Sequence, residues 1–166
     1  MIISNLAITG TDNDFGNLIK QSFPATHLKE FNNISNISNV IEETKDTEIF
    51  INYEYNNNLQ LEITKQWFEA HHNKKHLIIN IMWSEKVIKS DQAYVEYFQA
   101  KKDLNEFSWE VNLAEKDCLC ILISPGLEDN LSASIERADR FKENKLDISK
   151  EIIDIINWTI TKFYEI

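Results

Sequence analysis

The sequence predicts an α/β fold in which a mostly parallel sheet of about five strands carries helices on both faces. Short β-rich segments alternate with helix-length segments along the chain, which is typical of strands joined by helical crossovers. The strongest strand candidates are almost wholly apolar, as expected of strands covered on both faces. Because 166 residues suffice for one domain with its own core, we expect a single domain over residues 1–166.

The first half of the chain is expected to supply three strands. Residues 3–9 are β-rich and end at Gly10, and the helix that follows is ended by Pro24. Residues 26–31 are predicted as the second strand and 48–53 as the third. Between them we expect a short helix through residues 40–44, with Ser35 or Ser38 as its N-cap.

The second half is expected to alternate in the same way. A helix over about 58–73 precedes the most apolar strand, 77–83. A long helix over about 91–114 leads to a strand at 118–123. An irregular region with Pro125 and Gly126 follows, and the last predicted helix repeats Ile152, Ile153, Ile156 and Ile160.

Charge and cysteine usage exclude several classes of protein. The formal net charge of −10 argues against nucleic acid and anionic membranes as partners. The apolar runs are too short to span a membrane, and the N-terminus lacks the pattern of a signal peptide, so we expect a cytoplasmic protein. Cys118 and Cys120 would face the same side of one strand, which favours free buried thiols over a disulfide.

Glycine is rare, and its positions are therefore informative. The three glycines are Gly10, Gly16 and Gly126, where average usage would give about eleven. Each is expected to mark a backbone position that a side chain would disturb. Gly10 and Gly16 lie in the turn that joins the first strand to the first helix, where helix N-terminal amides would meet a pyrophosphate.

Tyr97 and Lys101 lie one turn apart on a predicted helix, and Ser84 ends the preceding strand. Reduction of a ketone places negative charge on its oxygen, which a nearby donor must neutralise. A tyrosine has an ordinary pKa of about 10, and a lysine ammonium beside it favours the phenolate and lowers that pKa. The three residue types at this spacing therefore suit carbonyl chemistry.

With these motifs, most of the chain resembles the short-chain dehydrogenase/reductase family. Residues 8–10 with Gly16 resemble its glycine turn, 50–52 the strand before its Asn-Asn-Ala-Gly motif, and 78–84 the strand that carries its serine. Residues 97–101 resemble its active-site helix, and 124–129 the Pro-Gly segment beside the nicotinamide. The resemblance implies a Rossmann-like domain, shortened between the glycine turn and Asn52, and hydride transfer to or from a small carbonyl or alcohol substrate.

The resemblance also assigns the site residues. It implies catalytic roles for Ser84, Tyr97, Lys101 and Asn58, with Asn57 the next choice for the asparagine. The cofactor would be NAD(H) or NADP(H), and the contacts implied are Thr9, Gly10, Asp12, Asn13, Phe15, Gly16, Asn52, Lys101, Pro125 and Gly126. No Arg or Lys closely follows the turn, so NAD(H) is preferred over NADP(H). Asp12 and Asp14 would repel a pyrophosphate, so the expected affinity is weak.

Two other functions stay open. The chain is alternatively a catalytically inactive relative of the family, a binding or scaffold protein that has lost dinucleotide binding. A third reading is a sugar-nucleotide epimerase or reductase of the family's extended branch, with Asn13 at the middle glycine position of the turn.

A homodimer or homotetramer is expected through the helices around 58–73 and 91–113. In the family these helices often pack against their copies, and here they carry many large apolar residues, namely Trp67, Phe68, Tyr94, Phe98 and Trp109. His71, His72 and His76 are read as cations at a helix end, and no metal site is predicted.

Overall fold

The computed structural model describes residues 2–54, 57–82, 91–114, 117–124 and 145–166. Five strands in this part of the chain form one sheet, paired in parallel throughout, in the order β2-β1-β3-β4-β5. The predicted α/β class with about five parallel strands is confirmed. The strands are β1 (Ile3–Thr9), β2 (Ala25–Phe31), β3 (Ile49–Asn52), β4 (His76–Ile81) and β5 (Cys118–Ile123).

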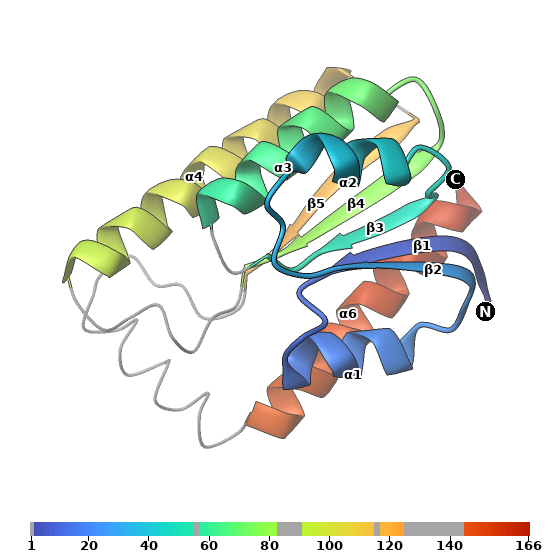
Figure 1. The fold of residues 1–166 in the computed structure, drawn as a ribbon, viewed down its shortest axis with the longest axis horizontal. Helices are drawn as coiled ribbons and strands as arrows, with labels where there is room; N and C mark the ends of the chain where they lie inside the picture. Colours follow the sequence, from blue (N-terminus) through green and yellow to red (C-terminus); the bar gives the residue numbers. More distant parts are fainter. Residues whose placement is uncertain (1, 55–56, 83–90, 115–116, 125–144) are drawn as a thin grey trace.

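Helices cover both faces of the sheet, which makes the domain Rossmann-like. On one face lie α2 (Ile37–Glu43), α3 (Asn57–His71) and α4 (Asp91–Ala114), and on the other α1 (Asp14–Ser22) and α6 (Lys145–Glu165) (Figure 1). The chain leaves β1 toward β2 but leaves β3 toward β4, in the opposite direction. The carboxyl ends of β1 and β3 therefore flank a topological switch point, where ligands of open α/β sheets bind.

The core has two layers because neighbouring strand residues point to opposite faces. Ile51 and Ile79 pack toward the layer of α1 and α6, whereas Phe50 and Ile78 pack toward Trp67 of α3. All six residues of β4 are buried. This two-sided burial explains why the central strands appear in the sequence as unbroken apolar runs.

Most predicted boundaries agree with the structure to within a few residues, but the predicted N-cap of α2 was wrong. The cap is Asn36, not Ser35 or Ser38. Asn36 has an extended backbone, and its side-chain oxygen accepts a 3.0 Å hydrogen bond from the amide of Ser38. The predicted serines flank a residue that performs the same chemistry, because an asparagine oxygen caps a helix as well as a hydroxyl does.

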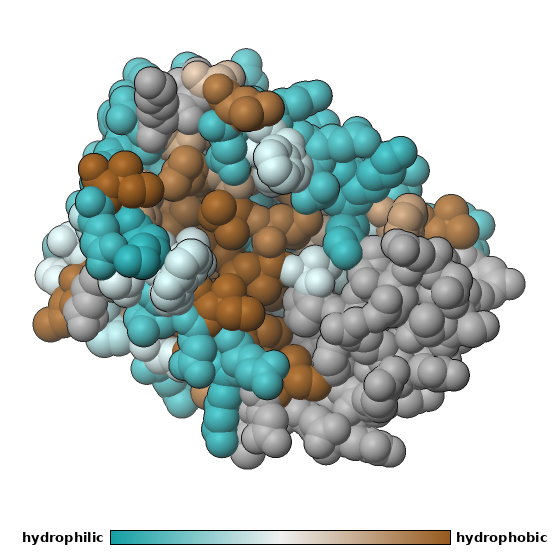
Figure 2. All heavy atoms as spheres, turned by 180° about the vertical axis from the view of Figure 1, so that it is seen from behind, coloured by the Kyte–Doolittle hydropathy of each residue, from teal (hydrophilic) through white to brown (hydrophobic). Residues whose placement is uncertain are grey.

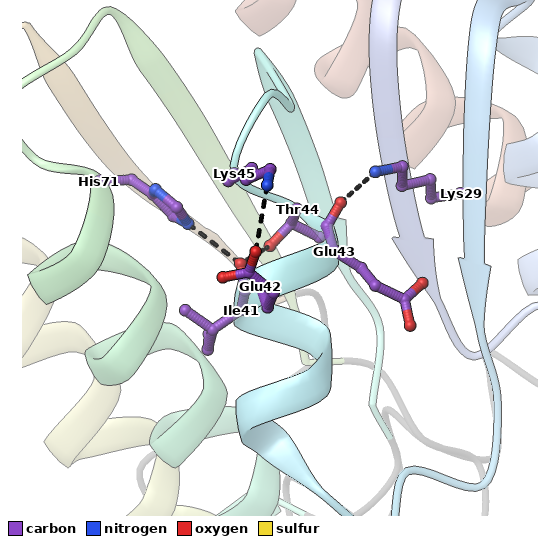
Figure 3. A network of polar contacts seen from close by, with 7 residues as sticks. All are labelled: Lys29, Ile41, Glu42, Glu43, Thr44, Lys45 and His71. Carbon is purple, nitrogen blue, oxygen red and sulfur yellow. Dashed lines mark hydrogen bonds and ion pairs between the residues drawn. The ribbon is translucent and has the colours of Figure 1, made fainter.

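Side chains from other segments close the carboxyl end of α2 (Figure 3). Lys29 of β2 donates to the carbonyl of Glu43, and the ring Nε2 of His71 lies 3.4 Å from the carbonyl oxygen of Ile41. The Thr44 hydroxyl donates to the carbonyl of Val40 at 2.7 Å. Lys29 and His71 thus supply partners to carbonyls that the last turn of a helix leaves unpaired, whereas the Val40 carbonyl accepts from both the hydroxyl and the backbone amide of Thr44.

The edge strand β5 is closed by a side chain of α4. The Asn112 amide donates to the carbonyl oxygen of Cys120 at 2.8 Å and accepts from the amide of Cys120 at the same distance. Asn112 thus bonds β5 as a neighbouring strand would.

A band of hydrophobic residues crosses the rear of the molecule (Figure 2). Among the described residues, no helix is long and apolar enough to cross a membrane.

Candidate functional site

The turn between β1 and α1 is built on two glycines that no other residue can replace. Gly10 has a φ of +73°, and a Cβ added there would lie 2.1 Å from the carbonyl oxygen of Tyr53. A Cβ on Gly16 would lie 1.9 Å from the carbonyl oxygen of Gly10. These are two of the three glycine roles in a dinucleotide-binding turn, a tight reversal after the strand and close packing of the helix on it. The third, a glycine that lets the pyrophosphate approach the backbone, is not met, because Asp14 stands at that position.

Asn13 caps the helix that follows the turn. Its side-chain oxygen accepts a 2.9 Å hydrogen bond from the amide of Gly16, and its amide nitrogen donates to the carbonyl of Gly10 at 2.5 Å. Asp14 occupies the first helical position, where a carboxylate complements the positive end of the helix dipole. The cap satisfies one of the amides that a bound phosphate would otherwise attract.

Phe15 and Thr9, two of the predicted cofactor contacts, are buried behind this turn. The Phe15 ring packs edge-to-face against Tyr53 with centroids 5.1 Å apart. The Thr9 hydroxyl donates to the side-chain oxygen of Asn52 at 2.9 Å and accepts from the amide of Tyr53 at 2.8 Å. Both residues therefore hold the turn against the end of β3. Their part in binding a cofactor would be to shape the turn.

Asn52 is wholly buried in a polar network that links three strands to α3. Its amide nitrogen lies within 3.1 Å of the Asn80 side-chain oxygen, the Thr64 hydroxyl and the backbone carbonyl of Gln60. The Gln60 amide in turn donates to the carbonyls of Asn52 and Ile81, at the ends of β3 and β4. Gln60 Oε1 is buried without a hydrogen-bond partner, and the other polar side-chain atoms of the network are paired. Buried networks of this kind fix the geometry around them. Neither Gln60 nor Thr64 is among the site residues predicted from the sequence.

Glu30 is a third residue near the turn that is not among the predicted site residues. It lies near the carboxyl end of β2, where its carboxylate accepts from the Thr11 hydroxyl at 2.9 Å and pairs with Lys20 at 2.7 Å. Lys20 is the main cause that lowers the pKa of Glu30, so the group is ionised at neutral pH. The available signal was its spacing of twenty positions from Gly10, the separation at which dinucleotide-binding folds place a ribose-binding acid.

Tyr97 lies at the carboxyl end of β4, as the resemblance requires, but its hydroxyl is engaged. The phenol is buried and donates a 2.5 Å hydrogen bond to the carbonyl oxygen of Met82. Burial raises the pKa of Tyr97 to about 12, an effect that the Ser124 hydroxyl opposes in part. Lys101 is half-buried one turn further along α4. The phenol is therefore protonated in this arrangement.

The remaining predicted residues are dispersed or fall outside the described part of the chain. Asn58 is exposed on the first turn of α3, and Asp12 is exposed beside the glycine turn. Ser84, Pro125 and Gly126 lie outside the described residues. The structure thus brings together Thr9, Gly10, Asn13, Phe15, Gly16 and Asn52 at the switch point, with Tyr97 at the neighbouring strand end.

The histidine prediction was wrong for two of the three residues. His71 and His76 are buried and pack with Trp67, with ring centroids between 5.2 and 5.8 Å apart. Burial lowers the pKa of both, so they are not the helix-end cations that their lysine neighbours suggested. In the described ranges no three His, Cys, Asp or Glu side chains come together as a metal site would require.

Comparison with known proteins gives no further guide: no family model, no curated protein and no solved structure matches the chain. The fold and the residues at its switch point therefore carry the functional argument alone.

Proposed function

We propose that the chain binds a nicotinamide dinucleotide over the β1–α1 turn and transfers hydride between it and a small carbonyl or alcohol substrate. The observation that carries this proposal is the turn itself. Both glycines are sterically obligatory, and they bring the N-terminus of α1 against the carboxyl ends of β1 and β3. A helix N-terminus at a switch point is a site for a pyrophosphate.

The charge around the turn supports NAD(H) over NADP(H). The ionised carboxylate of Glu30 can accept hydrogen bonds from ribose hydroxyls and would repel a 2′-phosphate. Lys20, the nearest cation, is already paired with Glu30. Asp12 and Asp14 add negative charge beside the pyrophosphate position, so we expect a dissociation constant on the order of 0.1 to 1 mM.

In the reduction, hydride would come from the nicotinamide, and a side chain of the protein would donate the proton to the substrate. Tyr97 would leave the Met82 carbonyl and donate its proton to the substrate oxygen. Lys101, on the same helix, would favour the resulting phenolate and hold the nicotinamide ribose, while Ser84 would hydrogen-bond the substrate oxygen. Asn58 would contribute by anchoring a water that connects Lys101 to solvent.

A binding or scaffold protein without catalysis is the second candidate, and Tyr97 is the observation that favours it. A phenol with its pKa raised to about 12 and its hydrogen committed to a backbone carbonyl has a packing role of its own. The polar network of Asn52 and Asn80 likewise stabilises the fold without any ligand. In this alternative the dinucleotide would not bind.

Titration with NADH, followed by its fluorescence and by calorimetry, separates the two candidates. We expect saturable binding by the native chain, and weaker binding of NADPH. Asp14→Asn should tighten NADH binding several-fold because it removes a charge beside the pyrophosphate. Asp117→Asn, at the opposite end of the sheet, is the matched control and should leave binding unchanged. If neither dinucleotide binds at millimolar concentration, the oxidoreductase proposal fails and the scaffold alternative stands.

A further inference from the structure

A buried hydroxyl at the carboxyl end of the sheet lacks a hydrogen-bond partner. Ser124 directly follows β5, and its Oγ is buried away from solvent with no partner among the described residues. Buried polar atoms are nearly always paired, because an unpaired one bears the full cost of its desolvation. An idle hydroxyl at a strand end beside a proposed site therefore suggests a partner that forms only during the reaction.

Ser124 lies beside the phenol of Tyr97. The Met82 amide donates to the Ile123 carbonyl at 2.9 Å, so β4 and β5 stay in register to their ends and Ser124 lies next to Met82. The Met82 carbonyl is the group that accepts from the Tyr97 hydroxyl. Leu122, two positions earlier, packs on the same cluster as Tyr97 and Met82, and side chains two apart along a strand share a face. The Ser124 hydroxyl also lowers the pKa of Tyr97, which requires it to lie close to the phenol oxygen.

The resting phenol does not use this neighbour. Tyr97 donates its hydrogen to the Met82 carbonyl, and Ser124 makes no hydrogen bond of ordinary geometry. Once the phenol loses its proton, its oxygen and the Met82 carbonyl are two acceptors facing each other. The phenolate then needs a donor, which a hydroxyl can provide by rotating its hydrogen. A hydrogen bond to an ionised oxygen is also stronger than one to a neutral oxygen.

We propose that Ser124 is a positioning residue, whose hydroxyl donates a hydrogen bond to the Tyr97 oxygen after that oxygen has given its proton to the substrate. This role rests on the proposed function. In the reduction, the O–H bond of Tyr97 breaks and its proton forms the O–H bond of the alcohol, while Ser124 keeps its own proton. In alcohol oxidation, the same contact stabilises the phenolate that takes the proton. The hydrogen bond forms with the ionised oxygen alone, so it favours proton transfer and leaves substrate binding unaffected.

The surroundings of Tyr97 make such a donor effective. The phenol packs in a cluster of apolar side chains, namely Met82, Ala100, Leu104, Leu61 and Leu122. In apolar surroundings a hydrogen bond to a charged oxygen is worth more than in water. Burial raises the pKa of Tyr97, and the Ser124 hydroxyl acts in the opposite direction. Lys101, one turn along α4, is the charged residue that the proposed function places beside the phenolate.

Fluorine NMR of the full chain measures this contact without cofactor or substrate. The five tyrosines are replaced by 3,5-difluorotyrosine, which ionises at a lower pH, and Tyr97→Phe identifies the resonance of residue 97. We expect Ser124→Ala to raise the pH midpoint of that resonance by about one pH unit, because the phenolate loses a charged hydrogen bond. Ser108→Ala, which removes a buried hydroxyl of α4 bonded to the Leu104 carbonyl, is the matched control and should leave the midpoint unchanged.

Two further variants at residue 124 separate the hydroxyl from the packing of the side chain. Ser124→Thr keeps the hydroxyl and should titrate as the native chain does. Ser124→Cys places a weaker donor at the same position and should give an intermediate midpoint. Ser124→Cys also provides the measurement if Ser124→Ala does not fold, which circular dichroism melting of each variant establishes.

Turnover provides a second arm that separates this role from the proposed function. With an alcohol substrate found by screening, Ser124→Ala should lower kcat about tenfold at about pH 8 and leave KM unchanged. The rise of kcat with pH should move upward by the same amount as the NMR midpoint. A raised midpoint in a chain that binds no dinucleotide would support the Ser124 contact while the oxidoreductase function fails. A midpoint that moves no further in Ser124→Ala than in Ser108→Ala would overturn the role of Ser124, whatever the turnover.

Discussion

The hydroxyl of Tyr97 donates a 2.5 Å hydrogen bond to the carbonyl oxygen of Met82, fifteen residues earlier in the chain. This contact fixes α4 to the carboxyl end of β4 at the point where the proposed carbonyl chemistry would occur. It also keeps the phenol protonated, because the buried hydroxyl gains nothing by ionising beside a carbonyl oxygen. Tyr97 thus has a structural contact whether or not it also has a catalytic role.

Replacing Tyr97 with Phe separates these two roles. The variant removes one oxygen and leaves the Met82 carbonyl without its donor, so we expect a loss of about 1 kcal/mol in the free energy of unfolding, measured by urea denaturation. If Tyr97 is the proton donor, carbonyl reduction should fall to background for a substrate found by screening. Tyr164→Phe, at an exposed tyrosine of α6 whose hydroxyl donates to Glu48, is the control for turnover and should leave it unchanged. Equal turnover in Tyr97→Phe and the native chain would contradict the catalytic assignment.

The two buried histidines predict that acid destabilises the fold. Burial lowers the pKa of His71 and His76, and nearby positive charge lowers both further. The unfolded chain therefore binds more protons than the folded chain below pH 6.5. The stability they contribute is full above about pH 6.5 and falls as the pH drops, by up to about 1.4 kcal/mol per pH unit for each group. Asp46 and Glu42 partly offset the lowered pKa of His71, and Glu48 does the same for His76. The Lys74 ammonium lowers the pKa of both histidines.

Urea denaturation between pH 7.5 and 5 measures this dependence. His76→Leu should flatten the slope, because it removes one buried group that must gain a proton on unfolding. His27→Leu, on an exposed position of β2, should leave the slope as it is. Parallel slopes in the native chain and His76→Leu would rule out His76 as a source of the acid sensitivity.

The hydrogen bonds of Asn112 to β5 should protect the open edge of the sheet. Asn112→Ala removes both hydrogen bonds to Cys120, so we expect a loss of about 1 to 3 kcal/mol in the free energy of unfolding. It also exposes the edge of β5 to pairing with other strands, which should increase aggregation on storage, measured by light scattering. Asn105→Ala, at an exposed position of the same helix, should change neither quantity.

The charge of Glu30 leads to a prediction about the cofactor preference, and this prediction rests on the proposed function. Glu30→Gln removes the charge that would repel a 2′-phosphate and frees Lys20 from its ion pair. The ratio of NADH to NADPH affinity, from fluorescence titration, should therefore move toward NADPH by several-fold. Glu43→Gln, on α2, is the matched control. An unchanged ratio would place the adenosine ribose away from Glu30.

Several features were readable from the sequence because they depend on neighbouring residues. Pro24 and the apolar spacing before it set the end of α1, and Gly10 marked a reversal that needs a positive φ. The alternation of strand and helix lengths predicted the parallel sheet. Asn36 was missed as a cap because three polar residues within four positions, Ser35, Asn36 and Ser38, offer the same hydrogen bond, and local sequence does not decide among them.

The sequence by itself determined the elements of this protein, their order and the glycine turn, since these follow from periodicity and backbone sterics within a few residues. Only the tertiary structure decided which side chains meet. Asn52 reaches Asn80 across 28 positions, and His71 and His76 become a buried neutral pair although lysines surround them in the chain. Such contacts depend on which strands and helices become neighbours. Desolvation then sets the protonation of the groups enclosed, which no local pattern encodes.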